Sequence, residues 1–446
     1  MNLNLFFRYV SASVAGMIAL SCYILADTYF VSAGMGADGL TALNLAIPIY
    51  SFIHGSGLMI GIGAATRFTM QKSRGQDREA DAYFTHALLS AGVFALVCVA
   101  GSFGAEQIVR IFGAQGRVAQ YSADYLRVIM SFGPAFLLNN VLLGFVRNDG
   151  APRLAMSAMI IGSLSNVVLD WVMIFPCGMG IVGAAVATGL APIISVLILS
   201  PHVLRSRCGF HVIRCPLSWR KAVTLLSAGV PSLVSEVSSG VVMIVFNFLL
   251  LHLGGNTAVA AYGVIANLSL VVISICTGIA QGIQPLLTRA CAAGRNKEAR
   301  LVLRAALICM LVFSALVFAL TQLGTDGIVG VFNSARDPQL QQTADAGMRL
   351  YFLAVPFAGF NIILSMYFTS AARLREAHVI SLLRGFVLIV PTTFLLAAVL
   401  GITGVWCAFP ADGGAVCAAR PGVLGICRKT AAGRSERINE KRAVKP

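Results

Sequence analysis

The sequence predicts an all-α integral membrane protein built as two six-helix bundles, with about twelve transmembrane helices in total. Three observations predict this class. Hydrophobic residues make up 57% of the 446 residues and charged residues only 11%, whereas a soluble domain is about half apolar and about a quarter charged. Apolar stretches long enough to cross a bilayer follow one another along the chain. Motifs of the first half also recur in the second half.

The composition excludes several other classes. A soluble enzyme of this size would need far more charge to cover its surface. The formal net charge of +15 would suit a nucleic-acid-binding protein, but the basic residues lie in loops and in the tail, so we expect no nucleic-acid partner. Eleven scattered cysteines resemble small buried apolar residues more than a disulfide framework. Cys208, His211 and Cys215 share one basic loop, which offers three ligands where structural zinc needs four, so we expect no zinc there.

Eleven apolar stretches are long enough to span a membrane, and a weaker twelfth begins near Ile402. A hydrocarbon core about 30 Å thick needs about 20 helical residues at 1.5 Å per residue. Glycine, proline or basic loops separate the stretches, which cover residues 8–33, 40–66, 83–104, 122–146, 154–176, 180–204, 223–252, 258–288, 301–321, 345–371 and 377–400.

The distribution of lysine and arginine predicts the orientation. Alternate loops over residues 67–80, 147–153, 205–221, 289–304 and 373–384 carry 19 of these residues, and the intervening loops carry 3. Loops rich in lysine and arginine stay in the cytoplasm. The N-terminus is therefore expected in the cytoplasm as well.

The two halves of the chain read as a tandem repeat. Residues 74–80 (RGQDREA) resemble residues 293–299 (AGRNKEA) at an offset of 219, and the motif Gly180-Ile181-x-Gly183 returns at residues 401–404 at an offset of 221. The copies are six helices apart and share one orientation, so a pseudo-two-fold axis should run along the membrane normal. We therefore expect an N-terminal lobe over 1–204, a cytoplasmic linker over 205–222, a C-terminal lobe over 223–410 and an atypical basic tail over 411–446.

Three acidic residues, Asp27, Asp170 and Glu236, fall well inside the predicted spans. An ionisable group at mid-bilayer costs at least about 2.5–3.5 kcal/mol, so it usually faces a cavity and has a function. The alternative for each is a protonated carboxylic acid that bonds neighbouring helices.

Asp27, Asn166, Asp170 and Thr188 are expected at one depth in the N-terminal lobe. Asn166 and Asp170 lie four residues apart on one helix face. Asp170 and Thr188 flank the hairpin 175–180, which is expected at the external surface of the membrane. At 1.5 Å per residue, each is expected about 12–15 Å below that surface. Their oxygen atoms could hold Na⁺, or a buried carboxyl group could carry a proton.

The second copy lacks this set, because Asp27 maps to Phe246 or Asn247, Asn166 to Val387 and Asp170 to Pro391. Cation coupling is therefore expected in the first lobe only. Glu236 stands alone near the middle of the seventh span. It faces either the central cavity, where it could meet a cationic substrate, or a hydrogen-bond partner of its own.

Several motifs of the chain together resemble those of a known family. They include residues 145–152 (FVRNDGAP), Asn166-x3-Asp170, residues 179–188 (MGIVGAAVAT), residues 26–31 (ADTYFV), Pro231-Ser232-x3-Glu236 and residues 278–285 (GIAQGIQP). As a set they resemble the multidrug and toxic compound extrusion (MATE) family over about residues 5–410.

The resemblance implies a multi-pass exporter of the bacterial inner membrane that exchanges organic cations or other amphipathic compounds for Na⁺ or H⁺. The cation site of the family would fall on Asp27, Asn166, Asp170 and Thr188, and some branches use a carboxylate at the position of Glu236. We expect a monomer that needs no cofactor beyond the coupling ion.

The end of the chain departs from this family. After Pro410 the apolar pattern gives way to Asp412, Arg420 and a basic end with eight Lys and Arg residues over 420–446. A charged residue costs about 2.5–3.5 kcal/mol at a helix centre. Either a reading-frame change near residue 410 has replaced the last helix, or a divergent twelfth span ends in a basic cytoplasmic tail.

Three other functions fit the sequence less well than export. A flippase for lipid-linked oligosaccharides should line its cavity with basic residues for pyrophosphate, and the predicted spans hold almost none. An enzyme would need a catalytic motif, and His54 and His86 have no such partners. A passive channel fits the spans, but a repeat with acidic residues in one half only suits a carrier better.

Overall fold

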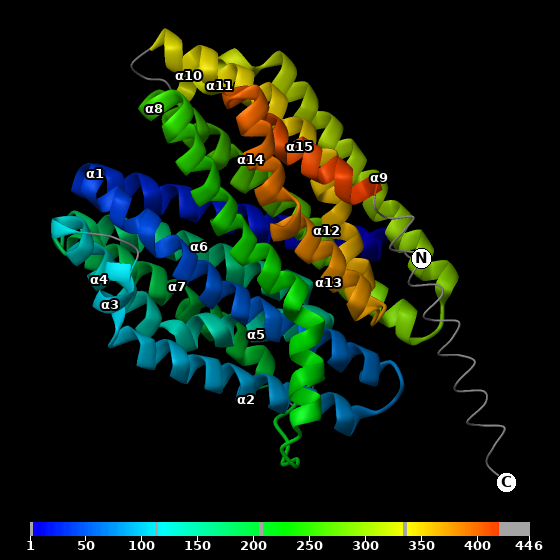
Figure 1. The fold of residues 1–446 in the computed structure, drawn as a ribbon. Helices are drawn as coiled ribbons and strands as arrows, with labels where there is room; N and C mark the ends of the chain where they lie inside the picture. Colours follow the sequence, from blue (N-terminus) through cyan, green and yellow to red (C-terminus); the bar gives the residue numbers. More distant parts are fainter. Residues whose placement is uncertain (1–2, 112–114, 205–207, 333–336, 419–446) are drawn as a thin grey trace.

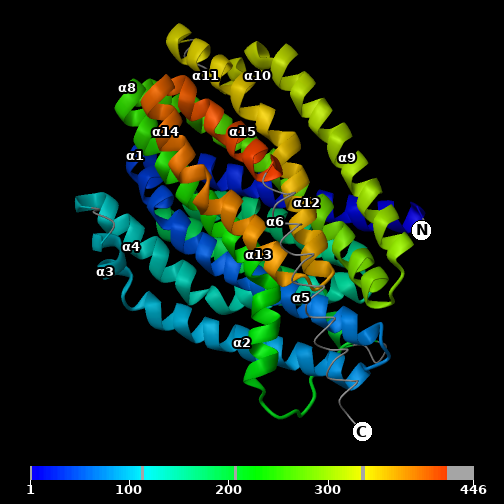
Figure 2. The same cartoon turned by 45° about the vertical axis from the view of Figure 1, so that its right-hand side comes forward.

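The computed structural model describes residues 3–111, 115–204, 208–332 and 337–418, which are almost entirely helical (Figures 1 and 2). In chain order the elements are α1 (Leu3–Lys72), α2 (Asp77–Ser102), α3 (Ala105–Ile111), α4 (Gly116–Ser131), α5 (Gly133–Asn148), α6 (Pro152–Ile174), α7 (Gly180–Val203), α8 (Trp219–Ala292), α9 (Asn296–Leu323), α10 (Thr325–Phe332), α11 (Pro338–Tyr351), η1 (Phe352–Ala354), α12 (Val355–Ser370), α13 (Leu374–Leu382), η2 (Leu383–Val387), α14 (Ile389–Leu400) and α15 (Ile402–Ala418).

Helices α1 and α8 are each two spans joined at a glycine. They contain 70 and 74 residues, so a straight helix of either length would measure roughly 105–110 Å, over three times the hydrocarbon thickness. Inside α1, Gly36 has φ 64° and ψ −152°, and inside α8, Gly255 has φ 64° and ψ −156°. This conformation carries no steric penalty for glycine. The two bends are 219 residues apart, which is the offset of the sequence repeat.

The predicted spans are confirmed as helices. In the described part of the chain, nine helices are long and apolar enough to cross a membrane, or ten when α4 and α5, bent by 48°, count as one span. That count treats α8 as one helix. Because α8 bends at Gly255 into two spans, the number becomes eleven, as predicted. The protein is a multi-pass membrane protein.

The helices pack into two lobes. The first, α1–α7, surrounds an apolar core that includes Phe84 and Phe145, and the second, α8–α15, surrounds a core that includes Phe246 and Trp406. Figure 1 shows α8 running between the blue-to-green helices of the first lobe and the yellow-to-red helices of the second. The start of α1 crosses to the second lobe, where Phe6 packs with residues of α8, α9 and α12.

The backbones of the two lobes approach closely at a set of glycines on α1 and α8. We call the end of the bundle with the loops 73–76, 149–151 and 293–295 the basic end. In the half of the bundle nearer the basic end, a Cβ added to Gly229 would lie 1.8 Å from the backbone oxygen of Met59. A Cβ added to Gly63 would lie 2.0 Å from the backbone oxygen of Leu225. The glycine seam, as we name it, comprises Gly63, Gly229, Gly278 and Gly282.

Beside the glycine seam, a buried polar network joins the lobes. Asn148 of α5 donates from Nδ2 to Gln284 Oε1 of α8 at 2.8 Å, and Thr69 donates to Asn148 Oδ1 at 2.8 Å. Gln284 Nε2 donates to Thr66 Oγ1 at 2.9 Å, and Arg289 Nη2 donates to the Asn148 carbonyl at 2.5 Å. Buried polar groups that all find partners fix one arrangement. The basic end is therefore closed between the lobes.

Two predicted boundaries need correction. The linker 205–222 is shorter than predicted, because α8 already begins at Trp219. The C-terminal lobe does not end at residue 410, because α15 runs from Ile402 to Ala418 with Pro410 inside it. Residues 419–446 of the predicted tail lie outside the described part of the chain.

The unexpected acidic residue of α15 has a basic neighbour. Asp412 is only 1% exposed and interacts electrostatically with Arg384 of η2. Arg384, which was predicted in a loop, also donates to Ser235 Oγ at 3.4 Å. An opposite charge offsets part of the cost of burying each group. The helix continues past residue 410 with this acidic residue buried inside it.

Candidate functional site

The structure brings Asp27, Asn166, Asp170 and Thr188 together inside the first lobe. Asp27 lies on α1, Asn166 and Asp170 on α6, and Thr188 on α7, and all four are buried. Helices α6 and α7 approach closely because they meet at Gly162, where a Cβ would lie 3.1 Å from the Ala191 backbone oxygen. The absence of a side chain at this crossing allows Thr188 to reach α6.

Asn166 links the other two polar residues of α6 and α7. With its amide oriented to satisfy both neighbours, its nitrogen donates to Asp170 Oδ2 at 3.0 Å and its oxygen accepts from the Thr188 backbone N–H at 3.2 Å. In the opposite orientation its nitrogen faces Thr188 Oγ1 at 3.4 Å. Asp27 joins the group from α1, since it interacts electrostatically with Asp170.

Both carboxylates keep an oxygen atom without a protein partner. Asp27 is 6% exposed and Asp170 is 0% exposed, yet Oδ1 of each accepts no hydrogen bond from any described residue. Leaving a buried polar atom unsatisfied costs about 1–3 kcal/mol, and more for a charged group. Two free oxygen atoms in one buried pocket therefore favour a bound cation or a proton.

Three tyrosines surround the carboxylates, and sequence reasoning missed them. Tyr23, one helical turn before Asp27 on α1, exchanges a hydrogen bond of 2.8 Å with Tyr50 farther along α1. Tyr125 of α4 interacts with Thr188 and with both carboxylates. The only signal in the sequence was the four-residue spacing of Tyr23 and Asp27, which places them on one face of α1.

Glu236 is not part of this group. It lies on α8 at the lobe interface, where its Cβ would be 3.0 Å from a Cβ added to Gly55 of α1. It interacts electrostatically with Tyr50, whose hydroxyl bonds Tyr23 beside Asp27. A chain of polar groups thus connects the interface carboxylate to the buried pair.

A cavity in the first lobe begins beside these residues and extends toward the basic end. Its empty space, together with the solvent at its open mouth, amounts to about 810 Å³, and Tyr23 and Thr188 line one part of it. Arg147 and Gln281 line another part. Arg147 is 6% exposed and donates to Gln281 Oε1 at 2.7 Å.

Arg147 corrects an expectation from the sequence. The loop 147–153 was predicted to hold it in the cytoplasm, but α5 runs to Asn148 and buries the guanidinium group. It donates hydrogen bonds to Gln281 Oε1 and Met159 Sδ, which are both neutral. The described residues that line the cavity therefore include one arginine and no carboxylate.

The second lobe fills the equivalent space with aromatic side chains. Phe246, at the position that matches Asp27, is fully buried and packs against Tyr262 with ring centroids 5.3 Å apart. Tyr262 in turn lies 6.2 Å from the Trp406 ring. The fold is repeated but the polar chemistry is confined to one copy.

The three possible zinc ligands predicted on one loop do not meet. His211 lies 3.8 Å from Asp81, and Cys215 Sγ lies 3.8 Å from His86 Nδ1. Cys208 points elsewhere, toward Asp149 and His202. Each of the three residues therefore has different neighbours in the folded chain.

Two helical lobes that bury carboxylates beside a cavity within the membrane define a transporter. The MatE family model matches residues 12–172 and 231–395, which is well over half of the chain. The chain therefore belongs to the MatE family, that is, the MATE family of multidrug efflux transporters.

Relatives and solved structures agree with this assignment. The chain is 24% identical to the multidrug export protein MepA of Staphylococcus saprophyticus, covering 87% of this chain and 86% of that protein. Against MepA of Staphylococcus aureus the identity is 23% with the same coverage. A MATE transporter solved in complex with MaL6 superposes with a TM-score of 0.88 at 22% identity, over 96% of this chain and 97% of the other.

A second solved structure shows the same fold. It is described as an outward-facing conformation of a multidrug resistance MATE family transporter, and it superposes with a TM-score of 0.88 at 22% identity over 96% of each chain. The fold expected from the sequence, all-α with two repeated bundles, is confirmed by these likenesses.

Proposed function

We propose that this protein is a secondary active exporter of the bacterial inner membrane that exchanges amphipathic or cationic compounds for inward Na⁺ or H⁺. The observation that carries the proposal is the buried pair Asp27 and Asp170, each with a free Oδ1. Two carboxylates in a water-poor site cannot both remain ionised without a counter-ion, so the site takes up Na⁺ or a proton. Asn166 and Thr188 complete the set of oxygen ligands.

The closed basic end supports alternating access. The charge bias predicts that this end faces the cytoplasm, so this conformation would block the cytoplasmic path and suit release to the outside. Transport is coupled only when the cation binds the two access states with different affinity. The link from Asp27 through Tyr23 and Tyr50 to Glu236 supplies a physical route, because Glu236 lies between the lobes.

A flippase for lipid-linked oligosaccharides is the second candidate. The buried Arg147 favours it, because a guanidinium group in the cavity could bind a phosphate. A pyrophosphate needs several such donors, and the described residues that line the cavity include one arginine and no lysine. Export of amphipathic compounds therefore remains the better fit.

A reconstituted system tests this function directly. Purified protein in vesicles is loaded with a fluorescent organic cation, and a sodium gradient or a pH gradient is imposed separately. We expect efflux to accelerate under one of the two gradients and to stay at the leak rate when both are collapsed. Equal efflux with and without gradients would indicate a channel, and movement of a lipid-linked saccharide without cation efflux would indicate the flippase.

A further inference from the structure

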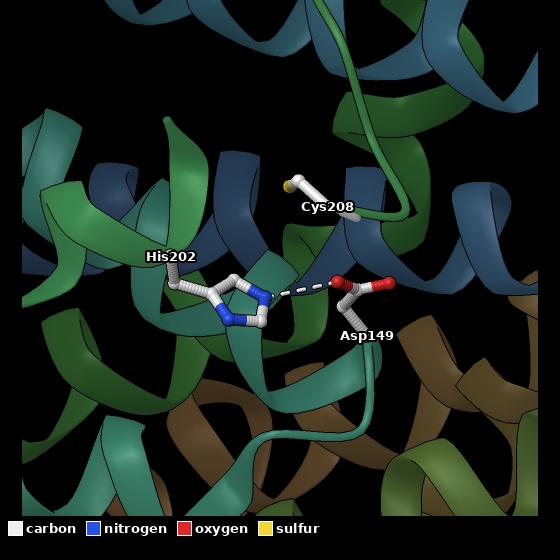
Figure 3. A group of neighbouring side chains, drawn as sticks. All are labelled: Asp149, His202 and Cys208. Carbon is white, nitrogen blue, oxygen red and sulfur yellow. Dashed lines mark hydrogen bonds and ion pairs between the residues drawn. The ribbon is translucent and has the colours of Figure 1, made fainter. Parts of the chain in front are cut away.

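Asp149, His202 and Cys208 come together at the basic end of the first lobe (Figure 3). Asp149 caps the C-terminal end of α5, His202 lies in the last turn of α7, and Cys208 follows in the linker between the lobes. One ligand atom from each residue lies within 4.8 Å of the others. In Figure 3 the His202 imidazole ring faces the Asp149 carboxylate, and the Cys208 side chain lies beside these two groups.

From this geometry we infer a binding site for a zinc-type transition-metal ion. Imidazole, thiolate and carboxylate are the ligands that zinc takes, and a sulfur ligand disfavours Mg²⁺ and Ca²⁺. A tetrahedral ion with bonds of about 2.0–2.3 Å holds its ligand atoms about 3.3–3.6 Å apart. His202 Nε2 lies 2.9 Å from Asp149 Oδ2, so a small movement of each side chain admits the ion.

The linker backbone holds the Asp149 carboxylate in place. The Gly209 backbone N–H donates to Asp149 Oδ2 at 3.0 Å, and a Cβ at Gly209 would lie 1.9 Å from Asp149 Oδ1. A side chain at this position would therefore have to displace the carboxylate. Such hydrogen bonds orient the ligands of metal sites.

Three protein ligands leave a fourth position for water. The side chains of His202 and Asp149 are 18% and 14% exposed, so water reaches the site while Cys208 stays buried. Without the ion, the Cys208 thiol donates to the Phe210 carbonyl at 3.3 Å. Binding replaces that thiol proton with the metal and releases the proton to solvent.

The site lies next to the contacts between the lobes. Asp149 follows Asn148, whose side chain bonds Gln284 of the second lobe. A bound ion would fasten the start of the linker to the end of α5. It would therefore stiffen the segment that joins the two lobes.

Zinc retention by the full-length protein tests this site. Protein treated with a chelator is equilibrated with Zn²⁺, desalted, and analysed for zinc by mass spectrometry. We expect about one zinc per chain, lost in Cys208→Ser and retained in Cys215→Ser, which removes another thiol of the same linker. No retained zinc in the unmodified protein, equal retention in both variants, or loss only in Cys215→Ser would overturn the inference.

A cobalt measurement guards against a variant that fails to fold. Co²⁺ added to the unmodified, metal-free protein should produce the near-ultraviolet charge-transfer band of a thiolate ligand. The band should be absent from Cys208→Ser at equal protein concentration. Cobalt bound without this band in the unmodified protein would show that Cys208 is not a ligand.

Discussion

Asp170→Asn is expected to abolish cation-driven efflux while the protein still inserts and folds. The amide preserves the shape and the hydrogen bond from Asn166, which lies 3.0 Å from Asp170 Oδ2, but it removes the negative charge that holds Na⁺ or a proton. Coupling free energies of about 1–3 kcal/mol correspond to about 5–150-fold, so we expect a loss on the order of 100-fold. The measurement is gradient-driven efflux of a fluorescent cation from vesicles.

Asp124→Asn is the matched control for this change. Asp124 lies on α4 and forms a surface ion pair with Arg127 at 3.6 Å, so the same chemical change should leave efflux nearly unaltered. Asp27→Asn combined with Asp170→Asn should be no worse than Asp170→Asn alone, since residues that act as one unit are not additive. Normal efflux from Asp170→Asn would refute the assignment of the cation site.

Gly229→Ala is expected to open the basic end. The new Cβ would lie 1.8 Å from the backbone oxygen of Met59, and neither backbone can move without moving its helix. Overpacking of this kind costs about 1–3 kcal/mol, which shifts the balance between access states by about 5–150-fold. Spin labels on Asp38→Cys and Asn256→Cys, in a background without native cysteines, should report a shorter distance as the opposite ends of the lobes approach.

Gly263→Ala provides the control on the same helix. A Cβ at Gly263 meets nothing within 4 Å, and both substitutions gain the same helix propensity. The label distance should therefore stay unchanged in Gly263→Ala. An unchanged distance in Gly229→Ala as well would show that the glycine seam does not decide which end is closed.

Most of the fold could be predicted from the sequence because its signals are local or periodic. Apolar length predicted the spans, and the repeat offset of 219 also separates Gly36 from Gly255, where the two long helices bend. The last helix was less predictable. Asp412 argued against a helix past residue 410, but its cost depends on Arg384, which is close only in the folded protein.

The candidate site was predictable only in part. Asp27 and Asp170 stood out because acidic residues are rare in membrane spans, and helix geometry gave their common depth. Tyr50 reaches Tyr23 only because α1 folds back at Gly36, and tyrosine in an apolar span carries no signal of its own. Arg147 appeared to be a loop residue, since its neighbours Asn148, Asp149 and Gly150 are typical of turns.

The linker shows the same limit for metal ligands. Sequence spacing singled out Cys208, His211 and Cys215, which are near one another along the chain. The folded chain instead places Cys208 beside residues 6 and 59 positions away, His202 and Asp149. Spacing is informative for ligands on one element, but it cannot find ligands that converge from three.

The contacts at Gly63 and Gly229 are between main chains, and this has a consequence for the speed of switching. The peptide groups exposed when the lobes part are already hydrogen-bonded within their own helices. Separating the lobes at these glycines therefore exposes little apolar surface to water and breaks few hydrogen bonds. The barrier to reversal should lie mostly in breaking the few side-chain bonds around Gln284, which makes the turnover rate adjustable by small chemical changes at that one position.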